Sequence, residues 1–365
     1  MRNIGLLSCV VVAFFAASLD AAEWGLKKGS PDLKTAGPLA FGPDGILLVG
    51  DTKAAAVYAI DTGDTKGDPS KVEIQVENVK QAIAALLKAG SADIKINDLV
   101  VSPASGNVYL SVSNSATPAL VRIDASGKLS QVPLKDVGFA KVELPNAPED
   151  KPVRTRRGVR NPRDTSITDL AFSDGKVLVS GVIKGGERGL STVREIPFPF
   201  VAADSGVRIE IYHGAHGQLE NYAAVRTFVP FIIDGEPSLL AGFTCTPLVR
   251  FDVKSFKGKD RVRGTTVAEL GNRNTPYDMI VYEKDGATFL LMANDRRGVM
   301  KISTEDIGRK EGITERVSGG GVAGQTYETI KELEGVNQLD KLNDDYAVVI
   351  VGSGDSHDLK TVALP

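Results

Sequence analysis

The sequence INDLVVSPASGNVYLSV, residues 96–112, determines the fold class. It contains an apolar run that begins at Leu99, a turn at Gly106 and a second β run from Val108 to Val112. Two such runs separated by a glycine-containing turn are typical of a β-hairpin. A third run, Leu120–Asp124, follows shortly after. This part of the chain therefore predicts a small antiparallel sheet.

The same pattern recurs along the chain. Further copies begin near Pro38, Ile167, Phe228, Tyr277 and Val336, at intervals of about 50–70 residues. A sheet of three or four short strands cannot bury both faces alone, so successive units must pack around a common axis. We therefore predict an all-β fold, a β-propeller with six blades, with seven blades as the alternative.

Three segments outside the repeats carry further expectations. Apolar spacing near 3.6 residues predicts short helical insertions at Val79–Lys88 and Tyr327–Leu333, each ending at a glycine. The last repeat lacks a fourth strand. We expect Glu23–Leu26 to supply this strand and so to close a ring of successive units.

The first 22 residues read as a secretory signal peptide. Arg2 gives a positive start, Ile4–Phe15 gives an apolar segment, and small residues follow. The apolar segment is shorter than the ~20 residues needed to span a bilayer, so we expect no transmembrane segment in the mature chain. The sequence thus predicts an exported protein, periplasmic or extracellular, with residues 23–365 forming one propeller domain. Removal of Cys9 leaves Cys245 alone, without an internal disulfide.

Composition limits the partners. Hydrophobic residues make up 42% of the chain, which suffices for a large core, and the formal net charge is −3. Without a basic excess, the chain is not expected to bind nucleic acid. A small polar molecule or a protein remains as the expected partner.

Propeller geometry gathers polar residues on one face. The loops between second and third strands and the linkers into the innermost strands surround one mouth of the channel. Asp98, Asp169 and Asp278 open innermost strands at equivalent positions, so they should stand around the channel. The alternative is that each accepts main-chain N–H bonds in a turn. The candidate ligand-binding residues are Asp51, Asn97, Asp98, Asp169, Asp278, Asn294, Asp295 and Arg296.

All three histidines and the single mature cysteine map to this same face. They are His213, His216, His357 and Cys245. Imidazole, thiolate and carboxylate groups suit zinc, copper or iron, so the candidate cofactor is a divalent or transition metal ion. In the alternative interpretation, the histidines cap turns and the cysteine is a small buried apolar residue.

Three segments resemble blades of the gluconolactonase–regucalcin group and related NHL-type propellers. They are Gly37–Gly45, Lys95–Asp98 and Pro276–Met279. The resemblance implies a propeller fold and, through Asn97-Asp98 and Asp278, substrate-contacting and metal-ligating positions. The first-blade metal ligand of that group is a glutamate, and Ala36 occupies its position here. A divalent-metal lactonase would therefore need other ligands.

These residues fit several classes of function. The chain could be a binding module for a small polar ligand or a protein, with the polar face as its site. It could instead be a metal-dependent enzyme, either a lactonase-like hydrolase or an oxidoreductase, or have a structural role in the envelope. No nucleotide-binding glycine loop, nucleophile elbow or haem-attachment motif is present, so the sequence leaves open whether it is an enzyme.

Overall fold

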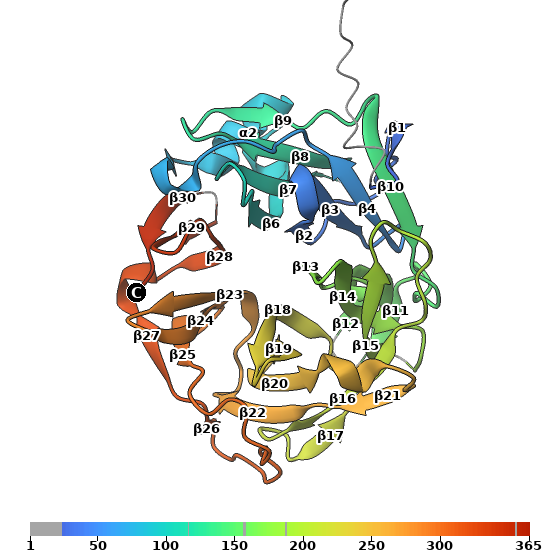
Figure 1. Cartoon of the computed structure of the whole chain (residues 1–365), viewed down its shortest axis with the longest axis vertical. Helices are drawn as coiled ribbons and strands as arrows, with labels where there is room; N and C mark the ends of the chain where they lie inside the picture. Colours follow the sequence, from blue (N-terminus) through green and yellow to red (C-terminus); the bar gives the residue numbers. More distant parts are fainter. Residues whose placement is uncertain (1–23, 116, 156–157, 187, 355) are drawn as a thin grey trace, which may run out of the picture.

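Six sheets of four or more strands surround a central channel (Figure 1). This computed structural model describes residues 24–115, 117–155, 158–186, 188–354 and 356–365; the expected signal peptide lies outside them. The predicted six-bladed propeller is confirmed, and the alternative of seven blades is wrong. We number the blades by the order in which their innermost strands occur in the chain.

Each blade has its innermost strand at the channel, and the strands follow outward. Blade one contains β2 (Leu39–Phe41), β3 (Ile46–Asp51), β4 (Ala56–Asp61), β10 (Val137–Glu143) and β1 (Lys27–Gly29). Blade two contains β6 (Ile94–Val101), β7 (Val108–Asn114), β8 (Thr117–Ile123) and β9 (Leu129–Gln131). Blade three contains β13 (Asp169–Ser173), β14 (Lys176–Ile183), β15 (Leu190–Pro197), β16 (Val207–His213) and β17 (Gln218–Glu220), with β21 (Arg261–Arg263) parallel to β16.

The other three blades follow the same plan. Blade four contains β18 (Val225–Ile233), β19 (Glu236–Phe243), β20 (Pro247–Asp252), β22 (Thr265–Leu270) and β26 (Val322–Gly324). Blade five contains β23 (Pro276–Lys284), β24 (Ala287–Asn294), β25 (Gly298–Ser303) and β27 (Tyr327–Ile330). Blade six contains β28 (Val336–Lys341), β29 (Tyr346–Ser353), β30 (Ser356–Ala363) and β5 (Gln75–Val76).

The blades do not follow one another in chain order. Around the channel the innermost strands run β2, β6, β28, β23, β18, β13 and back to β2 (Figure 1). Blade one therefore lies between blades two and three, and blade two lies between blades one and six. The chain reaches blade three from blade two through β10, which pairs with β4 on the outer side of blade one. The expectation of a ring in sequential order was wrong.

One apolar cluster fills each seam between neighbouring blades. Val57 and Val179 share the cluster between blades one and three, and Leu110 and Ile350 share the one between blades two and six. The strands are apolar on both faces because both faces meet another blade. Within the residues that the structure describes, the six seams thus hold the ring together without a disulfide, since Cys245 is a free thiol.

The ring is closed differently from the expectation. β5 is the fourth strand of blade six and pairs with β30 through Val76 and Gln75. The segment expected there continues into β1, which pairs with β10 in blade one, and Glu23 lies outside the described residues. The closing strand comes from the segment after β4, which extends to blade six, forms β5 there and then returns through α2 (Val79–Leu87) to β6 of blade two.

One predicted helix forms and the other does not. α2 (Val79–Leu87) buries Val79 and Ile83 against blades two and six. The segment expected to be the second helix is instead β27 followed by a short 3-10 turn at Lys331–Leu333, because Tyr327–Ile330 pairs with β25. The segment after β10 forms a separate hairpin outside the blades, β11 (Val153–Thr155) and β12 (Gly158–Arg160). Within the described ranges, no helix is long and apolar enough to cross a membrane.

Candidate functional site

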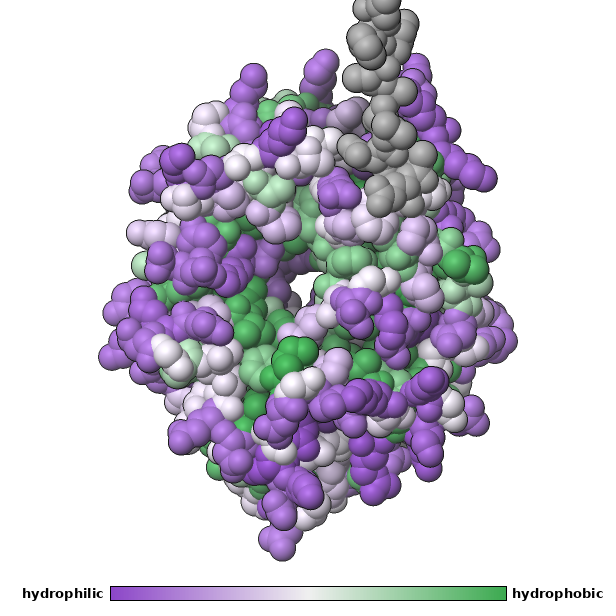
Figure 2. Space-filling model, viewed as in Figure 1, coloured by the Kyte–Doolittle hydropathy of each residue, from purple (hydrophilic) through white to green (hydrophobic). Residues whose placement is uncertain are grey.

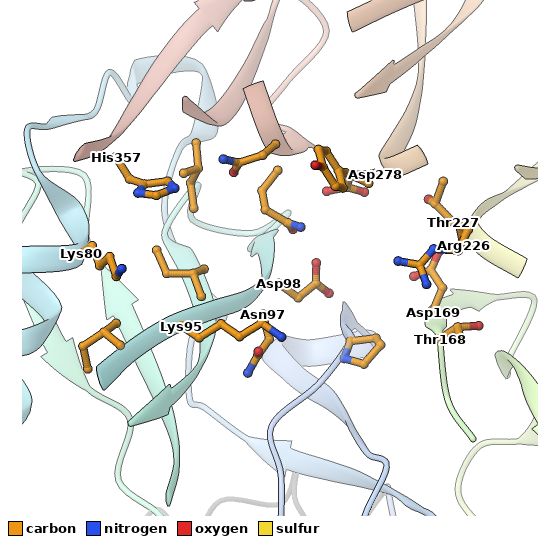
Figure 3. A pocket seen from close by; sticks show the side chains of 17 residues that line it. Lys80, Lys95, Asn97, Asp98, Thr168, Asp169, Arg226, Thr227, Asp278 and His357 are labelled. Carbon is orange, nitrogen blue, oxygen red and sulfur yellow. The ribbon is translucent and has the colours of Figure 1, made fainter. Parts of the chain in front are cut away.

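The innermost strands line a cavity of about 450 Å³, which we call the channel mouth. Figure 2 shows the molecule hollowed at its centre. Of the predicted ligand-binding residues, Asn97, Asp98, Asp169 and Asp278 line this cavity (Figure 3). His357 also lines it, beside α2 residue Lys80.

The aspartates of the channel connect neighbouring blades. Asp98 Oδ2 accepts the Leu39 N–H at 2.6 Å, which joins blade two to blade one. The same contact joins blade three to four, five to six, and six to two. The acceptors and donors of those three seams are Asp169 and Phe228, Asp278 and Leu339, and Asp340 and Val101. These carboxylates therefore hold the ring together, as the turn alternative anticipated in part, and sequence reasoning missed Asp340.

Burial makes these carboxyl groups weak acids. It raises the pKa of Asp169 to about 7 and that of Asp340 to about 6, because a charged carboxylate loses water in the channel. Burial also raises the pKa of Asp98, helped by the nearby charge of Asp169, and the pKa of Asp278, helped by Asp98. The channel is thus less negative than four ordinary aspartates would make it.

The remaining predicted ligand-binding residues do not line the channel mouth. Asp51 is fully buried and accepts the N–H groups of Lys34, Thr35 and Ala54, so it organises a loop. Asn294 accepts a hydrogen bond from the Asn274 side chain. Asp295 accepts from Thr275 N–H, and Arg296 donates its main-chain N–H to Asn274. The last three therefore support the loop that follows β22.

A second polar cluster lies at the seam between the outer strands of blades three and four. We call it the rim cluster; its residues are His213, His216, Glu220, Cys245 and Glu269. β16, β17 and β22 run close together at the edge of the ring (Figure 1). One ring nitrogen of each histidine and the Cys245 sulfur lie within 4.8 Å of one another. The fourth predicted metal residue, His357, is not in this group.

A hairpin positions both imidazoles. β16 ends at His213, which pairs with Gln218 of β17, so the side chains of His213 and Glu220 fall on one face as diagonal neighbours. The turn between the strands is held by Gly217 N–H donating to His213 O. It brings His216 against His213 with the ring centroids 3.8 Å apart. Gly214 is required in the turn, because a Cβ there would lie 2.9 Å from Cγ of Glu269.

One buried carboxylate orients both rings. Glu220 Oε2 lies 3.0 Å from His213 Nδ1, and Glu220 Oε1 lies 2.6 Å from His216 Nδ1. Glu220 is 4% exposed. Burial would raise its pKa, but the bonds from His213 and His216 outweigh burial and bring the pKa to about 2. An ionised carboxylate accepts, so each Nδ1 carries a proton and each Nε2 is left for another partner.

A strained loop presents the sulfur. Cys245 and Thr246 join β19 to β20 with φ values of 68° and 53°, in the left-handed region that residues other than glycine rarely adopt. Cys245 N–H donates to Asn274 O at 2.6 Å, and Thr246 Oγ1 donates to Gly271 O at 2.5 Å. Such conformations cost about 1–3 kcal/mol each and persist only where neighbours enforce them.

The electrostatics of the rim cluster favour a thiolate. The His213 ring and the Arg273 N–H lower the pKa of the Cys245 thiol against the opposing effect of burial. Burial would lower the pKa of His213, yet Cys245 and Glu220 raise it to about 9. Two buried atoms of the cluster have no hydrogen-bond partner among the described residues: Nε2 of His213 and Oε2 of Glu269. The Glu269 side chain is 1% exposed and bonds Gly214 N–H through its other oxygen.

Sequence reasoning missed both glutamates of the rim cluster. Glu220 could have been found, because it follows His216 by only four residues in the sequence. Glu269 lies in a β run on blade four with no motif around it, and only the packing of blades three and four brings it to the histidines.

Comparison with known proteins adds little. No known family and no curated protein matches the sequence. Among solved structures, the chain is similar to Drosophila Semaphorin 1b extracellular domains 1–2, at 10% identity and a TM-score of 0.39, covering 93% of this chain and 87% of that one. It is also similar to a putative glucose dehydrogenase-type oxidoreductase from Thermus thermophilus, at 14% identity and a TM-score of 0.35, covering 93% and 100%. A third similarity is to the PQQ-bound aldose sugar dehydrogenase of Streptomyces coelicolor, at 15% identity and a TM-score of 0.29, covering 93% and 97%.

Similarities this distant say nothing of function. The propeller rests on the sheets described above. The resemblance to the gluconolactonase–regucalcin group is not specifically supported beyond that fold.

Proposed function

We propose that this protein is a metal-binding propeller, with His213 Nε2, His216 Nε2 and Cys245 Sγ as the ligands of a transition metal ion. The observation that carries the proposal is the shared carboxylate. Glu220 engages Nδ1 of both rings, which leaves both Nε2 atoms for another partner, and one nitrogen of each ring lies within 4.8 Å of the Cys245 sulfur. A carboxylate behind a ligating histidine is the usual second layer of metal sites in proteins. A turn cap would not need two imidazoles fixed in the same tautomer.

The donor set selects the class of metal. A thiolate with two imidazoles suits zinc or copper and does not suit magnesium or calcium. Three protein ligands leave a coordination position for water or substrate in a zinc site. His216, whose side chain is 44% exposed, gives this position a route to solvent. We therefore favour metal-dependent chemistry over a purely structural role.

Cobalt substitution tests this proposal. Co(II) added to the metal-free protein should give a thiolate-to-cobalt charge-transfer band that is lost in Cys245→Ser. His213→Ala should also lose this band. His357→Ala, which removes the histidine of the channel mouth, should retain it. A spectrum that is identical in wild type and Cys245→Ser would contradict the proposal.

A second function is favoured by a separate observation, the cavity at the channel mouth. Its volume of about 450 Å³ lies in the range of small-molecule sites. We propose that this cavity binds a small polar ligand; the alternative is that a protein partner binds there. Ligand-observed NMR with a library of small polar compounds tests this, using Asn337→Trp to fill the cavity. Compounds that bind Asn337→Trp as well as they bind wild type would show that the ligand site lies outside this cavity.

We also propose that the protein is exported by its first 22 residues. The support is the order of charge, apolar segment and small residues in the sequence. The mass of the mature protein should correspond to cleavage near Ala21 or Ala22, and a retained Met1 would contradict this.

A further inference from the structure

Two cationic side chains line the channel mouth without a hydrogen bond or ion pair to a described residue. Arg226 at the start of β18 and Lys95 on β6 reach into the cavity from blades four and two (Figure 3). Neither side chain forms a hydrogen bond or ion pair with a described residue. Arg226 is an exposed residue at the edge of the cavity. Partial loss of water lowers the pKa of its guanidinium, and the nearby Tyr277 and Asp295 oppose that shift. The N–H donors of Arg226 are therefore left to solvent or to a ligand.

The acidic side chains of the cavity are already committed. Asp169 accepts the N–H groups of Phe228 and Leu170, and Asp278 accepts those of Leu339 and Met279. Releasing either carboxylate would leave a buried main-chain N–H without a partner, at a cost of about 1–3 kcal/mol. These groups are thus poor ligands for a cation.

The uncharged lining adds a second requirement. Gln338 lines the cavity, and its side-chain oxygen is buried and has no hydrogen-bond partner among the described residues. An amide oxygen accepts hydrogen bonds, so the matching ligand group is a donor such as a hydroxyl. The Asn97 amide is not free to help, because it donates to Ala36 O and Ser113 Oγ.

We infer that the channel mouth binds a small hydroxylated anion, a carboxylate or a phosphate ester. This rests on the proposed ligand-binding function of the cavity and gives that ligand its charge. Arg226 would hold the anionic group in a bidentate hydrogen bond, which guanidinium geometry favours for both carboxylate and phosphate. Lys95 would supply a second positive charge, and Gln338 would accept from a ligand hydroxyl. The volume accommodates a compound of this kind.

Calorimetry with three probes at constant ionic strength tests the inference. Citrate and glycerol 3-phosphate represent the carboxylate and the phosphate ester, and glycerol is the neutral control. We expect the anions to bind and glycerol not to bind. Arg226→Gln should weaken the better anion about tenfold or more. Arg154→Gln, an exposed arginine of the β11–β12 hairpin, should leave binding unchanged.

A matched pair of ligands tests whether a ligand hydroxyl donates a hydrogen bond to Gln338. Tricarballylate is citrate without its hydroxyl, so citrate should bind more tightly to wild type. Gln338→Leu should abolish that preference while leaving tricarballylate binding nearly unchanged.

Two outcomes would overturn the inference: neither anion binds at millimolar concentration, or Arg226→Gln binds both anions as wild type does. If neutral compounds sensitive to Asn337→Trp still bind in that case, the ligand-binding function stands and only the charge assignment fails. If no compound is sensitive to Asn337→Trp, the ligand-binding function itself fails.

Discussion

The rim cluster and the channel mouth use carboxylates in opposite ways. At the rim, Glu220 accepts from two imidazoles, and its pKa falls to about 2. In the channel, Asp169 accepts main-chain N–H groups, and burial raises its pKa to about 7. The difference shows that the partner, not the residue type, decides the role. The Glu220 contacts fit the metal site proposed above, whereas the Asp169 contacts join two blades.

The largest expected effect comes from removing the shared carboxylate. In Glu220→Gln, the side-chain amide has one acceptor oxygen instead of two. It can accept a hydrogen bond from only one of the two imidazoles, so the tautomers of His213 and His216 are no longer both fixed. We expect metal affinity to fall about 10–100-fold, the range found when such second-layer carboxylates are lost. Competition with a chelator measures this. Asp169→Asn should leave metal affinity unchanged, and an equal loss in both variants would erase the distinction between the two regions.

The next effect concerns the seams. Asp98→Ala leaves the Leu39 N–H at the junction of blades two and one without its acceptor. We expect the free energy of unfolding to fall by about 1–3 kcal/mol. Urea unfolding measures it, with Glu77→Ala as an exposed control that should change little. If Asp98→Ala matched the control, the seam role of the aspartates would be wrong.

The raised pKa of Asp169 predicts how stability depends on pH. Because the folded-state pKa of about 7 lies above that of the unfolded chain, the folded state binds a proton that the unfolded state has released. Its contribution is fully present below about pH 4 and is lost as the pH rises through about 7. Urea unfolding at several pH values should show this decline, and Asp169→Asn should reduce its slope. A slope that is unchanged in Asp169→Asn would show that other groups produce it.

The smallest effect lies at the ring closure. Thr361 Oγ1 accepts the Ile74 N–H at 3.0 Å beside the short β5–β30 pairing. Thr361→Val should lower the free energy of unfolding by about 0.5–1.5 kcal/mol. Thr117→Val, at an exposed position of β8, is the matched control and should stay within about 0.5 kcal/mol of wild type. Equal effects would mean that β5 contributes little to closure.

The sequence predicted the blades well, because each hairpin is a local pattern of apolar runs and turn residues. Ile96–Val101 and Val108–Asn114, for example, pair as their composition suggested. The exchange of blades one and two could not be predicted. It depends on where Gln75–Val76 and Val137–Glu143 find partners, and both pair with strands distant in sequence.

The candidate sites were predictable only in part. Propeller geometry placed His213, His216 and Cys245 on one face, and the structure brings their ligand atoms together. It could not separate His357 from them, because loops of different blades share a face without sharing a site. The three aspartates line the channel mouth as expected, and they also accept main-chain N–H groups of neighbouring blades, which carry no sequence signal.

Elemental analysis of the purified mature protein tests the central claim most directly. We expect a single zinc or copper ion per chain in wild type and none in the double variant His213→Ala/His216→Ala, with His357→Ala retaining the ion. A folded wild-type protein that holds no transition metal after growth in zinc- and copper-supplemented medium, or a double variant that keeps the ion, would contradict it.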